Sequence, residues 1–379
     1  MKLLIDFFLV GGILSTIAIF FLLLNARRKE LPQYILIVFF VIILFVFGNS
    51  YAELHEIPLL YVATFTIADI VVWLVGPILF LYIKSLFNKS EGLIKRHIFH
   101  FTPTVLYFVF ISIPLMVYIF NEELIPKYLE VLLDNDYIMA FLEEAYLIFY
   151  LLLSMKLFSN YRKAMKSNYS NLDESDFGWV RYLLLGSLAV ISIDLVINTY
   201  ETFFPTETEI EIGYITMVVL VLVIGYLGYC GINQSKVLMP NFLVKEIPSE
   251  EKEKTNQFAN VSNEELEALR SKLEHVLAVE KPYLDEDLTL SKLADLIPMA
   301  NKKLSCLLNQ YMNTTFYDLI NAYRVEAVKE KLNSCEFEYY TLLGVAYECG
   351  FKSKTSFNRI FKKETGVSPS EFKRTALAV

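Results

Sequence analysis

The sequence is poor in the residues that build disulfide frameworks and zinc sites. It has four cysteines among 379 residues. Cys230, Cys306, Cys335 and Cys349 form no Cys-x-x-Cys pair, and no histidine lies near them at the spacing of metal ligands. Neither a disulfide scaffold nor a zinc site is therefore indicated. We expect reduced thiols with packing roles, no metal and no cofactor.

Motifs that carry known catalytic chemistry are also missing. The sequence holds no Walker loop, no kinase signature and no His-Glu-x-x-His motif. The last apolar stretch, from 212 to 232, has no lysine that could bind retinal as a Schiff base. We therefore expect that the protein is not an enzyme.

Charge is scarce, and apolar residues are abundant in one part of the chain. Hydrophobic residues make up 55% of the sequence and charged residues 20%, and the mean hydropathy is +0.44. The apolar excess lies before about Met239, whereas the remainder has the composition of a soluble helical domain. This asymmetry predicts a membrane domain followed by a soluble one.

Seven stretches approach or exceed the roughly 20 apolar residues that a helix needs to cross a bilayer. They are Leu3–Leu24, Tyr34–Tyr51, Leu59–Phe87, Ile98–Phe120, Tyr137–Phe158, Trp179–Phe203 and Ile212–Ile232. Helices that are hydrophobic on all sides need lipid to cover them. We therefore predict an all-α seven-helix transmembrane bundle over 1–235, acting as a sensor domain. A signal peptide is a weaker interpretation of the first stretch, which is too long and ends in Arg27-Arg28-Lys29.

The connections between these stretches alternate in charge. The first, third and fifth are basic, the second and sixth have no lysine or arginine, and the fourth has only Lys127 among several acidic residues. Basic residues accumulate in short cytoplasmic loops. The pattern predicts a multi-pass protein of the inner (cytoplasmic) membrane, with its N-terminus outside and the chain after Met239 in the cytoplasm.

A few polar side chains fall inside the predicted spans, where they are costly. The candidates are Asn49, Asp69, Asp194 and Asn198, with Glu143 and Glu144 as further possibilities. They could form a ligand or proton site, or they could set helix packing through hydrogen bonds between helices. The sequence leaves both interpretations open.

A linker is predicted over 236–262, where prolines and a run of glutamate and lysine interrupt the apolar pattern. Ser262 and Glu265 then have the spacing of a capping box. Leu266, Leu269 and Leu273 follow at helical spacing. This apolar face either packs on its own domain or forms a homodimer contact.

Two helix-turn-helix patterns follow, about fifty residues apart. In the first, helices over 288–297 and 301–311 flank Pro298. In the second, helices over 342–349 and 353–365 flank Gly350, a residue that adopts tight turns at low cost. One longer helix, 316–332, connects them. We predict an all-helical, double helix-turn-helix DNA-binding domain over 263–379, with double-stranded DNA as its partner.

The overall charge of −8 at first argues against nucleic acid, but the local charge does not. From Lys352 to Arg374 the chain has seven basic and two acidic residues, a balance of +5. Such a cluster suits the phosphate backbone.

The second pattern resembles the AraC family of regulators. The residues that carry the resemblance are Gly350-Phe351, the Phe-x-Arg-x-Phe-Lys-Lys core at 357–363, and Gly-x-Ser-Pro at 366–369. Arg324 and Ala327 on the connecting helix also match. The first unit departs from the family's pattern at Cys306, Leu308 and Asn309. The resemblance covers about the last hundred residues and implies a transcription regulator.

Helical spacing divides the second unit into an outward face and a core face formed by Phe357, Ile360 and Phe361. The outward polar candidates for DNA contact are Ser353, Lys354, Ser356, Asn358 and Arg359, and the candidate phosphate contacts are Lys352, Lys362 and Lys363, with Lys373 and Arg374. In the first unit the corresponding candidates are Lys302, Lys303 and Ser305.

These features together predict a membrane-bound, one-component sensor that couples an unknown signal ligand to transcription. Two alternatives stay open for the bundle. It could receive a signal from a partner membrane protein, or it could be a transporter or enzyme that uses Asp69 and Asp194 as relay groups. In each case the C-terminal domain binds DNA.

Overall fold

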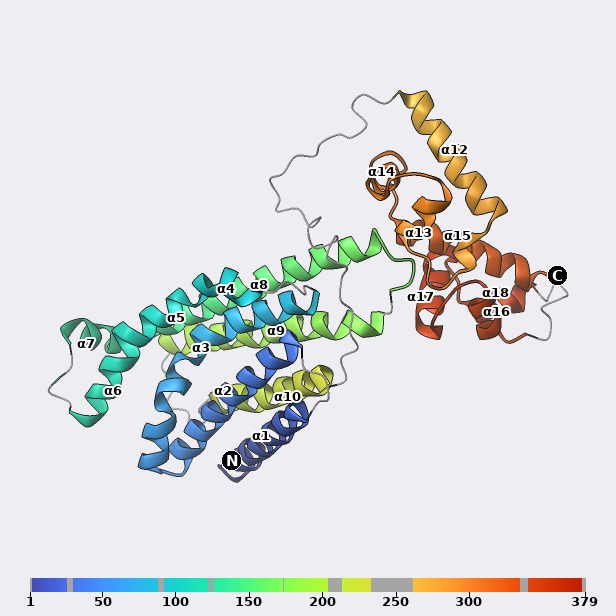
Figure 1. Cartoon of the computed structure of the whole chain (residues 1–379). Helices are drawn as coiled ribbons and strands as arrows, with labels where there is room; N and C mark the ends of the chain where they lie inside the picture. The colour runs from blue at the N-terminus through green and yellow to red at the C-terminus, as the bar shows by residue number, and fades with distance from the viewer. Residues whose placement is uncertain are drawn as a thin grey trace. The chain divides into compact units, whose positions relative to one another are not determined.

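The structure is a computed structural model that describes residues 2–25, 30–87, 92–121, 124, 126–172, 174–203, 213–232, 262–334 and 340–376. Apart from one isolated β-bridge, the regular structure of these residues is helical, which confirms the all-α prediction. The chain divides into two compact units (Figure 1). The first comprises residues 1–159 and 178–244, and the second 160–177 and 245–379. Except for Ser262, the predicted linker lies outside the described residues.

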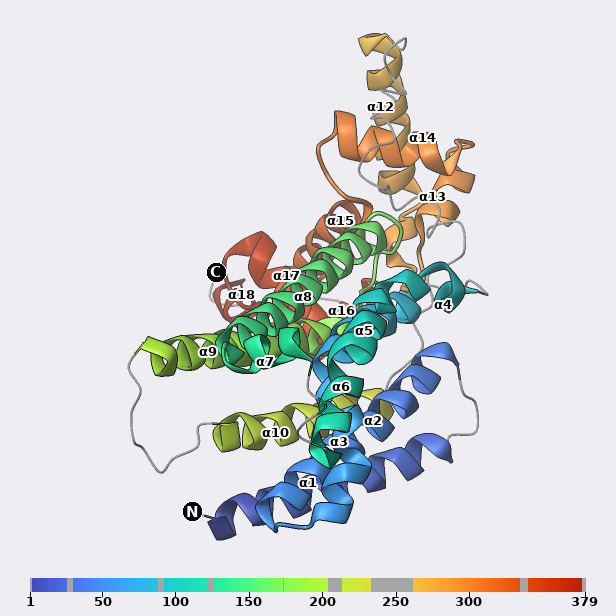
Figure 2. The same cartoon turned by 90° about the vertical axis from the view of Figure 1, so that its left-hand side faces the viewer.

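The first unit is a set of long helices. Its elements are α1 (Lys2–Leu24), α2 (Leu31–Leu54), α3 (Pro58–Phe87), α4 (Leu93–Arg96), η1 (Ile98–Phe101), α5 (Thr102–Tyr107), η2 (Phe108–Ser112), α6 (Ile113–Phe120), α7 (Lys127–Leu133), α8 (Asp136–Lys166), α9 (Glu174–Phe203) and α10 (Gly213–Ile232). The helix α1 contacts both α2 and α10, and α2 contacts α3 (Figures 1 and 2).

Six helices of the described chain are long and apolar enough to cross a membrane, and they correspond to the first six predicted spans. The seventh prediction corresponds to α10, whose apolar part, Val219–Cys230, is shorter. Between 11% and 39% of each span's most apolar window is buried within the protein. Large side chains such as Leu3, Phe7 and Leu59 are 70% or more exposed. Apolar faces of this extent fit a membrane domain, because lipid would cover them.

The fourth span is irregular because of its prolines. A 3-10 turn, an α-helical turn, a π-helical turn and a final α-helix follow one another over Ile98–Phe120. Pro114 has no N–H, so the carbonyl of Phe110 lacks its usual donor four residues on. The Tyr128 hydroxyl, from α7, donates a hydrogen bond to this carbonyl at 2.7 Å.

Side-chain hydroxyls also compensate for the missing N–H of Pro77 inside α3. Its missing N–H leaves the carbonyl of Trp73 without a helical donor. Thr104 Oγ1 donates to that carbonyl at 2.7 Å, and the Tyr146 hydroxyl donates at 3.4 Å. Side chains of α5 and α8 thus satisfy a backbone group that could find no water inside a bilayer.

The second unit contains α12 (Asn263–Val279), η4 (Pro282–Leu284), α13 (Leu290–Leu296), α14 (Asn301–Cys306), η5 (Leu307–Tyr311), α15 (Phe316–Leu332), α16 (Leu342–Glu348), α17 (Lys354–Thr365) and α18 (Pro369–Ala376). Five of these helices begin at a serine or threonine whose hydroxyl accepts a backbone N–H of the first turn. These caps are Ser262, Thr289, Thr315, Thr341 and Ser353. They explain where the helices begin.

One hydrophobic core holds the second unit together and includes residues from α12 through α17. On α12, the buried side chains are Leu266, Leu273, Val276 and Leu277. They pack into this core, so the apolar face predicted for α12 is used within its own domain. The connecting helix α15 begins and ends at the residues predicted from the sequence.

We predict that Thr104→Val destabilises the first unit by about 1 kcal/mol, because it removes the closer of the two donors to the Trp73 carbonyl. Thermal unfolding of the detergent-solubilised protein would measure the change. Thr66→Val is the matched control, since the Thr66 hydroxyl reaches only the Met116 thioether, at 3.5 Å. Equal stability losses for the two variants would contradict this account of Pro77.

Candidate DNA-binding interface

The two helix-turn-helix units are present as predicted. In the first, α13 is followed by a turn and by α14, which continues into the π-helical turn η5. In the second, α16 is followed by Gly350 and by α17. Ala294 in α13 and Ala346 in α16 are fully buried, as small residues at a close helix crossing should be.

Gly350 is required in the second turn for two separate reasons. Its φ of +84° lies in the left-handed region that side chains disfavour. A Cβ at this position would also lie 2.5 Å from the Tyr283 carbonyl oxygen and 2.9 Å from Arg324 Nε. The turn therefore packs directly against the centre of the domain.

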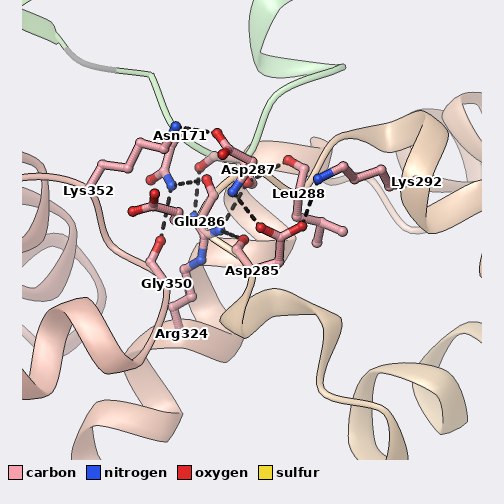
Figure 3. Close-up of polar contacts among 10 residues, drawn as sticks. Asn171, Asp285, Glu286, Asp287, Leu288, Lys292, Arg324, Gly350 and Lys352 are labelled. Atoms are coloured by element: carbon pink, nitrogen blue, oxygen red, sulfur yellow. Dashed lines mark hydrogen bonds and ion pairs between the residues drawn. The ribbon is translucent and has the colours of Figure 1, made fainter.

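Arg324 of α15 lies at that centre and is fully buried. Its Nε donates to the Tyr283 carbonyl at 2.7 Å, and its Nη2 donates to the Asp285 carbonyl at 2.8 Å (Figure 3). Burial lowers the pKa of Arg324 to about 10, so the guanidinium is still charged at neutral pH. Arg324 thereby joins the connecting helix to the chain that precedes the first helix-turn-helix unit.

The outer face of α17 is the clearest candidate for the major groove. Phe357, Ile360 and Phe361 are buried, which confirms the predicted core face. The exposed residues on the opposite side are Lys354, Thr355, Asn358 and Lys362, and the partly buried Arg359 lies beside them. We call these five residues the α17 stripe. Thr355 was missed by sequence reasoning, although its position four residues before Arg359 places it on this face.

Ser356 does not face outward, so that prediction was wrong. Its side chain is only 6% exposed. Ser356 lies four residues before the buried Ile360, and residues at this spacing share one helix face. Ser353 has the role of the N-cap, because its Oγ accepts the Ser356 N–H at 3.2 Å.

Besides Lys373, whose Nζ donates to the Tyr340 carbonyl at 3.4 Å, three of the predicted basic contacts are hydrogen-bonded within the domain. Arg359 Nη2 donates to the Tyr317 hydroxyl at 2.8 Å, and Lys363 Nζ donates to Asp318 at 2.9 Å. Lys352 forms an ion pair with Asp287.

The pair between Lys363 and Asp318 changes both pKa values. Burial alone would raise the pKa of Asp318, but hydrogen bonds from Lys363 and Thr315 outweigh it, and the net pKa is lowered. The hydrogen bond to Asp318 raises the pKa of Lys363. Both groups are therefore charged at neutral pH, and phosphate would compete with Asp318 for Lys363.

In the first helix-turn-helix unit, Lys302 is exposed on α14. Lys303 Nζ lies 3.6 Å from a Glu265 carboxylate oxygen, and thus pairs with α12. Ser305 is partly buried, and its carbonyl accepts a hydrogen bond from Asn309 Nδ2 at 2.9 Å. Lys302 is therefore the most outward of the three predicted contacts.

Two of the polar residues of the predicted spans connect neighbouring helices. Asn49 Nδ2 donates to the Tyr61 carbonyl at 3.2 Å and to Thr64 Oγ1 at 3.1 Å. Asp69 Oδ1 accepts a hydrogen bond from the Tyr107 hydroxyl at 3.2 Å. Asp194 is partly buried in α9, and the side chain of Asn198 lies outside the described residues. The contacts of Asn49 and Asp69 suit a packing role.

In a comparison with known proteins, one protein-family model matches this region. The family described as a helix-turn-helix domain matches residues 293–375. The match runs from within α13 to α18 and so includes both α14 and α17. Neither the curated proteins nor the solved structures contain a match to this chain.

Gly350→Ala should cost at least about 2 kcal/mol of stability, because it adds a steric clash to the cost of a positive φ. Gly366→Ala is the control, since Gly366 has a φ of +81° and no atom within 4 Å of its missing Cβ. This control should cost about 1 kcal/mol. Thermal unfolding of the detergent-solubilised full chain would compare the two, and equal costs would refute the steric part of the account.

Proposed function

Because residues 293–375 form an AraC-type helix-turn-helix domain, we propose that the protein is a membrane-bound transcription regulator that binds specific DNA sequences in response to a signal at the membrane. The observation that carries this proposal is the α17 stripe. It presents basic and amide side chains on one face of a capped helix whose opposite face is anchored in the core. That arrangement is the one with which such helices enter a major groove.

Within the α17 stripe, two kinds of contact are expected. Arg359 and Asn358 can form bidentate hydrogen bonds with base edges, and Thr355 can add a third contact. Lys354 and Lys362 neutralise phosphates and position the domain without reading the sequence. The helix α14 contributes Lys302 in a neighbouring groove, so the two units together contact one face of the duplex.

The proposed topology has seven crossings with the N-terminus outside. The support is the distribution of lysine and arginine among the connections, since the basic loops alternate with acidic ones. An odd number of crossings then brings the DNA-binding domain to the cytoplasm, where DNA is available to it.

The bundle is proposed as the sensor. A signal that binds one packing arrangement of the helices better than another shifts the population between them, by no more than its difference in affinity. Hydrogen bonds between helices, such as those of Asn49 and Asp69, would distinguish such arrangements.

Selection from a randomised duplex library tests the DNA-binding function, with the full chain in lipid nanodiscs. We expect one discrete motif. Arg359→Ala should relax one position of it, by about 1 to 3 kcal/mol of discrimination. Lys362→Ala is the control: it should weaken binding to all sequences alike and reduce the slope of log K against log salt by about 1. Binding without any selected motif would overturn the proposal.

Cysteine accessibility on intact cells tests the topology. With the native cysteines replaced, Ile57→Cys lies between α2 and α3 and should react with a membrane-impermeant maleimide. Lys95→Cys, in α4, should react only after the membrane is permeabilised. The reverse pattern would place the DNA-binding domain outside and contradict the proposed function.

A further inference from the structure

The chain between α8 and α9 belongs to the same compact unit as the DNA-binding domain. We call residues 166–172 the interspan segment. Tyr169 forms an antiparallel β-bridge with Thr289, directly before α13. Leu290 N donates to the Asn168 carbonyl at 3.0 Å, and Ser170 N donates to the Leu288 carbonyl at 3.4 Å. The segment therefore pairs with the DNA-binding domain through its backbone.

Ser170 connects the segment to the buried centre of the domain. It is 1% exposed, and its Oγ donates to the Leu288 carbonyl at 2.7 Å. Arg324 Nη2 donates to Ser170 Oγ at 3.0 Å, and Arg324 Nη1 donates to the Ser170 carbonyl at 3.2 Å. Asn321 Nδ2 donates to the same carbonyl at 3.0 Å. Half of the hydrogen bonds of the buried guanidinium thus go to this one residue.

Asn171 bonds to the chain before the first helix-turn-helix unit and to the turn of the second. Its Nδ2 donates to the Glu286 carbonyl at 2.6 Å and to the Gly350 carbonyl at 3.0 Å (Figure 3). The first acceptor precedes the first unit, and the second lies in the turn that leads into α17. The side chain of Asn171 therefore connects the two units.

The segment also borders the α17 stripe. Lys166 Nζ lies 5.4 Å from the centre of the Tyr317 ring, in a cation–π contact. The hydroxyl of that same ring accepts the hydrogen bond of Arg359. A duplex that forms hydrogen bonds with Arg359 must replace the Tyr317 hydroxyl as its partner. It must therefore approach the ring that Lys166 contacts.

We propose that the interspan segment is an intramolecular ligand of the DNA-binding domain and competes with DNA for it. This inference rests on the proposed function. In the docked state, Lys166 lies against the ring of Tyr317, whose hydroxyl accepts the hydrogen bond of Arg359, and Asn171 holds the turn before α17. Undocking removes Lys166 from that ring and frees the turn, and DNA affinity rises.

Through this arrangement, a structural change in the bundle can reach the DNA-binding domain along one helix. The helix α8 is continuous from Asp136 to Lys166, so its last turn leads directly into the segment. A signal that moves or rotates α8 acts on the segment through this covalent connection. The signal then shifts the balance between docked and undocked states by its difference in affinity for them.

A reversible disulfide tests the proposal in the full chain in lipid nanodiscs. Tyr169 and Thr289 face each other without direct backbone hydrogen bonds between them, which is the closer kind of antiparallel pair. Tyr169→Cys with Thr289→Cys should therefore form a disulfide on oxidation. The oxidised protein should bind the selected duplex about ten-fold more weakly than the same sample after reduction. Each single cysteine variant controls for oxidation elsewhere.

A release variant gives the opposite test. Asn171→Ala removes the two hydrogen bonds that the Asn171 side-chain amide donates to the DNA-binding domain. It should tighten DNA binding several-fold. Asn168→Ala is the matched control, because its side chain bonds only to the Ala164 carbonyl of α8, at 2.9 Å. It should leave the affinity unchanged.

The outcomes separate this inference from the proposed function. Failure of the two cysteines to form a disulfide would overturn docking itself. A disulfide that leaves DNA affinity unchanged or raises it would overturn competition, as would weaker binding by Asn171→Ala. Absence of sequence-selective binding both by the reduced protein and by Asn171→Ala would instead overturn the proposed function, and the competition with it.

Discussion

The burial of one guanidinium organises the second unit. Arg324 is fully buried and charged, and an unpaired charge in that position would be strongly destabilising. Its donors reach carbonyl or hydroxyl oxygens of Tyr283, Asp285 and Ser170. These acceptors lie in the short 3-10 helix η4, in the residue that follows it and in the interspan segment. The positions of the chain before the first helix-turn-helix motif and of the interspan segment follow from satisfying this one side chain.

The same constraint, that buried polar groups need partners, shapes the first unit. Pro77 and Pro114 each leave one carbonyl without its helical donor. Thr104 and Tyr128 supply donors from other helices. A bilayer offers no water as a substitute. Side-chain hydroxyls thus determine which helices must lie beside the two prolines, and they make the irregular fourth span compatible with a membrane domain.

Local pattern explains most of the candidate DNA-binding surface. The period of Phe357, Ile360 and Phe361 identifies the core face of α17, and the opposite face follows from helix geometry. Ser356 shares the buried face of Ile360 and Thr355 shares the outward face of Arg359, so helical spacing, not residue type, places both. What no local pattern shows is that Arg359, Lys352 and Lys363 bond to Tyr317, Asp287 and Asp318. DNA would have to displace these internal partners.

The sequence by itself determined the all-helical class, most of the long helices and the position of the two helix-turn-helix motifs. The physical reason is that apolar length, helical period, caps and turn glycines act over a few residues. Only the tertiary structure decided that Ser170 and Asn171 belong with the DNA-binding domain. Ser170 lies 154 positions from Arg324, and no local pattern in the sequence marks it. Their contact exists because a buried charge needs acceptors, and the fold supplies them from a distant connection.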